Sequence, residues 1–304
     1  ALTGKLSASG QKAPGWMQVT GNQLRATVAV REFWQQYPKQ LRMQADGTMR
    51  VGLWPAGTWP LQVFAGAMKT HEMLIGLDRV GSTDANLAGI YANILGDPPL
   101  AVQAPKHNAA TNVYGEIGVT DDLLTSVADI IPAAQAAVTN HLADLVTQYG
   151  DILFDRTDGN GTSTGHEYGF WNWGDGKTHL PGAGWENNDW EISRCALTWF
   201  AASGNVGMWK LFDATARHFR DVDVIHADIG LRFDYTEAGN PAVSGGKASQ
   251  QGKTRYSPNN KQHDLGNYHL GENHLDVFRG AFLAEHYLLT GDQLSLDVLK
   301  EIYT

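Results

Sequence analysis

The chain has 304 residues, of which 42% are hydrophobic and 18% charged; this balance is typical of a compact globular protein and excludes collagen, coiled coils and wholesale disorder. The formal net charge is −9, which argues against binding of duplex nucleic acid through counterion release. The single cysteine excludes a disulfide framework and a cysteine-based zinc site. The chain has no run of about 20 apolar residues, so no membrane span is predicted. We therefore expect neither a nucleic-acid nor a membrane partner.

The first part of the chain has a hydrophobic period near two, which predicts β-strands. Asp46 and Gly47 form a dipeptide that favours a tight hairpin turn. Three prolines between 97 and 114 indicate an extended connector. Residues 1–115 are therefore predicted to form a β-rich, sandwich-like domain. Its strands are expected over 24–33, 41–44, 48–54 and 69–77.

From about residue 120 the apolar spacing becomes that of amphipathic helices. The helix stops at Gly204 and Gly291 lie 87 residues apart, as do the helix entries at Gly184 and Gly271. A repeat of this length predicts repeated helical hairpins, so residues 116–304 are predicted to form an α/α toroid with an incomplete ring that carries the active-site cleft. The helical stripes are expected over 134–149, 192–200, 208–219, 277–288 and 294–303.

A long loop, roughly residues 227–270, lies between the two hairpins, and loops of this length inside a compact domain are usually functional or disordered. Its part from 244 to 263 contains four basic residues and no Asp or Glu. This local basic patch is interpreted either as a solvated loop or as an anion-binding loop. The four residues are Lys247, Lys253, Arg255 and Lys261.

A second cluster, residues 168–190, combines tryptophans with amides and charged groups. Sugar rings stack on aromatic faces while their hydroxyls require paired donors and acceptors, so this composition is suited to carbohydrate recognition. A tryptophan-rich packing corner with capping residues is the alternative. The candidate substrate-binding residues here are Trp171, Trp173, Asp175, Lys177, Trp185 and Asn187.

A third cluster, residues 263–274, aligns with 185–187 through the 87-residue repeat, which places both clusters on one rim. Its three histidines are His263, His269 and His274. Their spacing matches no zinc signature, so we expect no metal and no cofactor. General acid/base catalysis or substrate hydrogen bonding is the preferred interpretation; a metal site and structural histidines are the alternatives.

Six stretches of the chain form a recognisable pattern: 31–39, 51–55, 69–72, 173–175, 216–223 and 263–264. With these residues the chain resembles the exo-acting rhamnogalacturonan lyases of polysaccharide lyase family 26 and their YetA-like relatives. The match covers only the central part of those longer proteins. The resemblance implies a β-rich region joined to an α/α toroid, and β-elimination on pectic rhamnogalacturonan. We expect an acidic carbohydrate substrate, flanking domains of a longer chain as partners, and an extracellular or periplasmic location.

Elimination requires a group that neutralises the uronate carboxylate, a base that removes the C5 proton and an acid that protonates the leaving oxygen. His263 or His269 is our choice of base, and a tyrosine is our choice of acid. The rim residues expected for proton transfer are His263, His269, His274, Tyr268 and Tyr256, and those expected to bind substrate include Arg255, Lys253, Asn187, Asn273 and Glu272.

Two other functions are compatible with the same residues. A glycoside hydrolase of the α/α toroid type would need two carboxylates across the scissile bond. A non-catalytic carbohydrate-binding fragment would use the tryptophan rim without the histidines. The carboxylates available to a hydrolase are Asp175, Glu186, Asp189 and Glu272.

Overall fold

The computed structural model of the chain describes residues 12–58, 68–81, 87–119, 169–175, 192–224, 226 and 280–303. These residues belong to two compact units, which are described separately. Unit 1 contains the described residues 12–58, 70–81, 87–101 and 169–170, and unit 2 contains the others. The predicted domain boundary at residue 115 stays a prediction.

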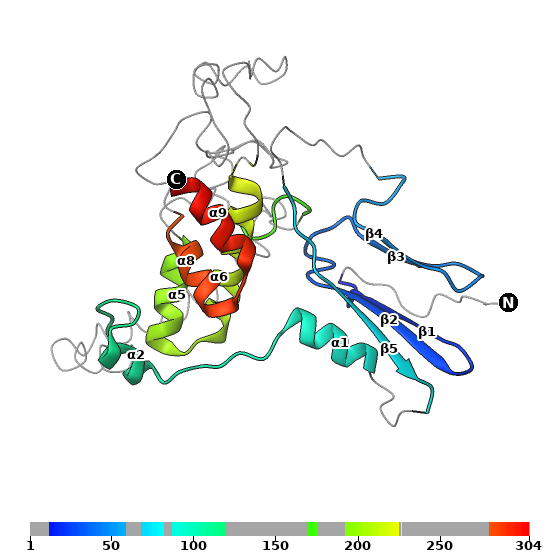
Figure 1. The fold of residues 1–304 in the computed structure, drawn as a ribbon, viewed down its shortest axis with the longest axis horizontal. Helices are drawn as coiled ribbons and strands as arrows, with labels where there is room; N and C mark the ends of the chain where they lie inside the picture. The colour runs from blue at the N-terminus through cyan, green and yellow to red at the C-terminus, as the bar shows by residue number, and fades with distance from the viewer. Residues whose placement is uncertain are drawn as a thin grey trace, which may run out of the picture. The chain divides into compact units, whose positions relative to one another are not determined.

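The main sheet of unit 1 has three antiparallel strands, β1 (Trp16–Thr20), β2 (Leu24–Val30) and β5 (Met73–Arg79), in the order β1-β2-β5 (Figure 1). The central strand β2 is the most buried, because it has a neighbour on each side. The predicted strand at 24–33 is confirmed but ends at Val30, and the strand predicted at 69–77 begins only at Met73.

The predicted hairpin is confirmed as β3 (Gln40–Met43) and β4 (Met49–Gly52). Gly47 has φ +86°, a conformation that glycine adopts at little cost. The Asp46 carboxylate accepts a hydrogen bond from the Thr48 backbone N–H at 2.9 Å, and this bond lowers the pKa of Asp46. The turn chemistry therefore agrees with the sequence signal.

Helix α1 (Leu87–Gly96) packs on the three-stranded sheet and was not predicted. A side chain at Gly76 of β5 would collide with the Tyr91 ring, so the glycine lets the helix approach the strand. The Tyr91 hydroxyl donates to the Asp78 carboxylate at 2.9 Å. Sheet and helix are thus joined by close packing and by a hydrogen bond.

The described residues of unit 2 form two helical hairpins, and both were predicted (Figure 1). The first is α5 (Ile192–Ser203) with α6 (Val206–His218), and the second is α8 (Phe282–Thr290) with α9 (Gln293–Tyr303). Gly204 and Gly291, at the two turns, have φ +71° and +74°, the left-handed conformation that commonly ends a helix.

The prediction of an extended connector over 97–114 is wrong in its second half, where α2 (Pro105–Thr111) forms. Pro105 stands in the first turn of this helix, where the missing N–H has no helical partner to lose. Asn108 of α2 is buried and donates to the Ala201 carbonyl of α5 at 3.0 Å. A proline in the sequence therefore marked a helix start and not an extended segment.

Aromatic and aliphatic side chains from both hairpins form the core of unit 2. The rings of Phe219 and Phe282 meet edge to face with centroids 5.0 Å apart. A buried hydrogen bond of 2.8 Å joins Ser193 of α5 to Thr215 of α6. Other fully buried members are Leu197, Phe212, Val222 and Leu283.

The described part of the chain is therefore mixed, with two small antiparallel sheets in the N-terminal part and six helices, and without a closed sheet. The helix predicted over 134–149 lies outside the described residues. Within the described ranges, no helix has both the length and the apolar character needed to cross a membrane.

Candidate functional site

Three of the predicted site residues are described, namely Trp171, Trp173 and Asp175, and all are buried, with 6%, 6% and 0% of their surface exposed. At the two tryptophans, this burial is what the packing-corner interpretation expects. The remaining predicted residues lie outside the described part of the chain and stay predictions: Lys177, Trp185, Asn187, Lys253, Arg255, Tyr256, His263, Tyr268, His269, Glu272, Asn273 and His274.

The segment 171–175 rests directly on helix α6 because of Gly174. This glycine has φ +98°, and a Cβ placed on it would lie 2.7 Å from the Cβ of His218 and would collide with the Ala214 carbonyl oxygen. Only glycine combines this backbone conformation with so close an approach. Because of this close approach, the next residue, Asp175, lies beside His218 at the end of α6.

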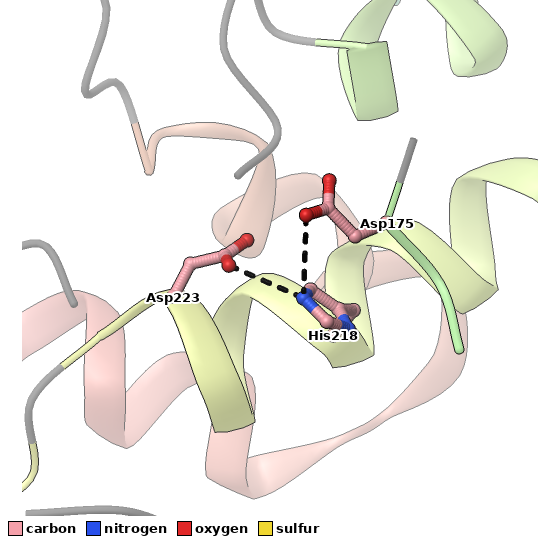
Figure 2. A group of neighbouring side chains, drawn as sticks. All are labelled: Asp175, His218 and Asp223. Atoms are coloured by element: carbon pink, nitrogen blue, oxygen red, sulfur yellow. Dashed lines mark hydrogen bonds and ion pairs between the residues drawn. The ribbon is translucent and has the colours of Figure 1, made fainter. Parts of the chain in front are cut away.

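The result is a compact group of three side chains, Asp175, His218 and Asp223, shown in Figure 2. The His218 Nε2 atom lies 3.2 Å from Asp223 Oδ1 and 3.9 Å from Asp175 Oδ2. Asp175 is 0% exposed, and His218 and Asp223 are each 1% exposed. We call these three residues the Asp–His–Asp group.

Asp223 reaches His218 because the helix changes its winding. Helix α6 ends at His218 and continues without a break into η2 (Phe219–Asp223), a turn of π-helix. Residues five apart are about 1.4 turns apart in an α-helix and would face different directions. The π-helix has the i→i+5 repeat that aligns such residues, and single π turns are frequent at functional sites.

The proton position on His218 is fixed by a backbone carbonyl. The Nδ1 atom lies 2.9 Å from the carbonyl oxygen of Trp173. A carbonyl only accepts, so Nδ1 must carry the proton and donate it. In a neutral ring, Nε2 then has a lone pair directed at two carboxylates. A cation between these acceptors, either a proton on Nε2 or a metal ion, would contact all three side chains.

A second polar network lies beside the Asp–His–Asp group and begins at Arg220. This guanidinium donates through Nε to Asp221 at 2.8 Å and through Nη1 to Asp292. Asp292 accepts from Ser295 at 2.7 Å. Burial opposes the charged form of Asp292, but the hydrogen bond from His286 and the charge of Arg220 together hold its pKa well below the ordinary value.

His286 provides an instructive comparison with His218. Its Nε2 atom lies 3.1 Å from Asp213 Oδ1, whereas its Nδ1 atom faces the Ser295 hydroxyl at 2.9 Å. Ser295 donates its one hydroxyl proton to Asp292, so it accepts from His286, whose Nδ1 therefore carries a proton as it does in His218. The second carboxylate, Asp292, also approaches Nδ1, at 3.4 Å. The two carboxylates thus stand at opposite ring nitrogens and cannot share one cation.

His218 and Asp223 were part of a resembling stretch but were not among the predicted site residues. The histidine falls on the apolar side of a helical stripe, which is the usual place of a structural histidine. Asp223 follows His218 by five residues, and in an α-helix residues at this spacing face different directions, so the sequence did not indicate a contact between them. A run of charged residues, Arg220, Asp221 and Asp223, at the end of an apolar helix was the available clue.

No family model matches this chain, and no curated protein matches it in sequence. The site is therefore interpreted from its own geometry and from the sequence pattern.

Proposed function

We propose that the chain is a polysaccharide lyase that cleaves rhamnogalacturonan-type pectic polysaccharide or oligosaccharide by β-elimination. The proposal includes the finer architecture expected from the sequence, a sandwich-like β region followed by an incomplete α/α toroid. It also includes an extracellular or periplasmic location, and flanking domains of a longer chain as partners. Its substrate is an acidic carbohydrate of the kind degraded when pectin is broken down.

One observation supports the proposal. Within each unit, side chains from resembling stretches that are distant in sequence contact each other. In unit 2, Asp175 from the stretch 173–175 joins His218 and Asp223 from the stretch 216–223. In unit 1, Arg31 from the stretch 31–39 contacts both carboxylate oxygens of Glu72 from the stretch 69–72, at 3.0 and 3.1 Å.

Such meetings are expected if the resembling stretches maintain one active fold. The buried histidine–carboxylate contacts require matched partners, because a buried charge without one is costly, and the Arg31–Glu72 pair is part-buried. These contacts bring the resembling stretches together in this chain, while the resemblance itself and the catalytic assignments rest on the sequence.

The expected chemistry uses the histidine cluster and the basic loop together. Lys253 and Arg255 neutralise the uronate carboxylate, which acidifies the C5 proton, and His263 or His269 removes that proton. A tyrosine, Tyr256 or Tyr268, protonates the leaving oxygen. The same basic loop explains why an acidic protein would bind a polyanionic substrate.

The test is incubation of the full chain with rhamnogalacturonan and, separately, with a neutral polysaccharide. Ultraviolet absorbance measures the unsaturated uronate, and a reducing-end assay measures total cleavage. His263→Ala and the double change Lys253→Gln with Arg255→Gln are compared with wild type. His107→Ala and Lys106→Gln are the matched controls, because both residues are exposed on α2.

A lyase produces the absorbance from rhamnogalacturonan only; the loop and His263 variants lose it, and both controls keep it. Reducing ends without absorbance would instead indicate the hydrolase that uses two carboxylates. Binding without any product would indicate the carbohydrate-binding fragment. Either of these two results contradicts the proposal.

A further inference from the structure

We propose that the Asp–His–Asp group binds one divalent first-row transition-metal ion, with Zn²⁺ as the best-fitting ion. The ligands would be His218 Nε2, Asp223 Oδ1 and Asp175 Oδ2. This inference goes beyond the lyase proposal, because β-elimination as described above needs no metal.

The spacing of the three donor atoms fits one small cation. Zinc binds imidazole nitrogen and carboxylate oxygen at roughly 2.0–2.2 Å, so two ligands of a tetrahedral ion lie about 3.3–3.6 Å apart. The observed separations from Nε2 are 3.2 Å to Asp223 and 3.9 Å to Asp175, and all three donor atoms lie within 4.8 Å of one another. Asp223 is already at the ligand spacing from His218, and Asp175 has to move toward the other two donors to share one ion.

The hydrogen bond to Trp173 prepares the histidine for a metal. Histidines that bind metals almost always donate their other ring N–H to a carbonyl or a carboxylate, which fixes the ring and leaves the ligating nitrogen unprotonated. His218 does this through Nδ1 at 2.9 Å. Its Nε2 lone pair is then directed at the place that a shared cation would occupy (Figure 2).

Charge balance favours a divalent ion over a proton. Two carboxylates and a neutral imidazole have a charge of −2, and a proton on Nε2 reduces this only to −1. A divalent ion neutralises the group completely. Since the three residues are at most 1% exposed, charge that is neutralised by an ion within the group lowers the cost of burying it.

The type of donor selects the class of metal. Calcium takes six to eight oxygen ligands and magnesium an octahedron of oxygens with several waters, whereas an imidazole nitrogen with two carboxylates suits zinc and its first-row neighbours. Three protein ligands leave the fourth tetrahedral position to solvent or to another ligand.

The experiment uses the full chain, freed of metal with a chelator and dialysed against Zn²⁺ in an excess of Ca²⁺ and Mg²⁺. Bound zinc is measured by atomic emission. The variants are Asp175→Asn and Asp223→Asn, which keep the side-chain shape but remove a charged ligand. Asp213→Asn is the matched control, because Asp213 also faces a histidine Nε2, that of His286, at 3.1 Å.

Wild type and the Asp213→Asn control are expected to bind one zinc per chain, and each ligand variant is expected to lose affinity by at least about tenfold, by comparison with losses seen even for supporting residues. Unchanged zinc binding in both ligand variants would overturn the proposal. Absence of zinc from wild type would also overturn it.

A second measurement covers variants that do not fold. Crystals of wild type soaked with Zn²⁺ are expected to give an anomalous-scattering peak at bonding distance from His218 Nε2. A peak at other histidines alone would contradict the proposal. Neither measurement uses a carbohydrate, so its outcome is independent of the lyase proposal.

Discussion

Gly174 offers the sharpest test of how the Asp–His–Asp group is assembled. Gly174→Ala introduces one methyl group at φ +98°, where it would lie 2.7 Å from the Cβ of His218 and would collide with the Ala214 carbonyl. We expect this substitution to lower the free energy of unfolding and to separate residues 173–175 from helix α6.

The size of the effect follows from two contributions. A left-handed conformation costs an L-residue about 1–2 kcal/mol, and overpacking against a fixed backbone costs typically about 1–3 kcal/mol more. The expected loss for Gly174→Ala is therefore about 2–5 kcal/mol. Gly291→Ala isolates the first contribution, because Gly291 has φ +74° and nothing within 4 Å of the added Cβ, so about 1–2 kcal/mol is expected there.

Urea unfolding followed by circular dichroism measures both losses. If the two alanine variants lose the same free energy within about 0.5 kcal/mol, the close approach of Gly174 to α6 is refuted. A wild-type-like Gly291→Ala would refute the assigned helix end at Gly291.

Three further outcomes are expected from the same unfolding assay. Asn205→Ala should lose about 1 kcal/mol and Asn205→Ser much less, because the Asn205 side chain caps α6 by accepting from two backbone N–H groups; equal losses would contradict this. Phe282→Ala should lose about 3–5 kcal/mol, since Phe282 is 1% exposed against Phe219; a loss below about 1 kcal/mol would show a poorly packed core. The lowered pKa of Asp292 gives stability that is present above its ordinary value of 3.8 and is lost as the pH falls below it, on the order of 1–2 kcal/mol. Asp292→Asn should reduce this fall in the free energy of unfolding at acid pH. An unchanged fall would contradict the lowered pKa of Asp292.

The local elements were predictable wherever a period and a stop signal coincided. The hairpin turn at Gly47 and the helix stops at Gly204 and Gly291 all have positive φ, which is the property that places glycine in the sequence at such points. The helical hairpins followed from amphipathic spacing interrupted at these glycines. Strand ends were less well predicted, because the hydrophobic residues Phe33 and Trp34 follow Val30 in the sequence after the ladder has ended.

The Asp–His–Asp group could not be predicted for two physical reasons. Asp223 faces His218 only through a π-helical turn, and the sequence was interpreted with an α-helical period. Asp175 joins them only because Gly174 permits contact with α6 across more than forty residues of sequence. The histidine-rich rim was easier to notice, because its residues are close together in the chain, but it lies outside the described residues.

The zinc proposal rests on the claim that residues 173–175 and 218–223 form one buried group. The most direct measurement is nitrogen NMR of the metal-free chain with isotope-labelled histidine, with the His218 signals assigned by comparison with His218→Gln. We predict that Nδ1 carries a proton held in the hydrogen bond to Trp173 and that only Nε2 responds to added Zn²⁺. A His218 ring with its proton on Nε2 alone, or one that exchanges freely between tautomers, would contradict the account.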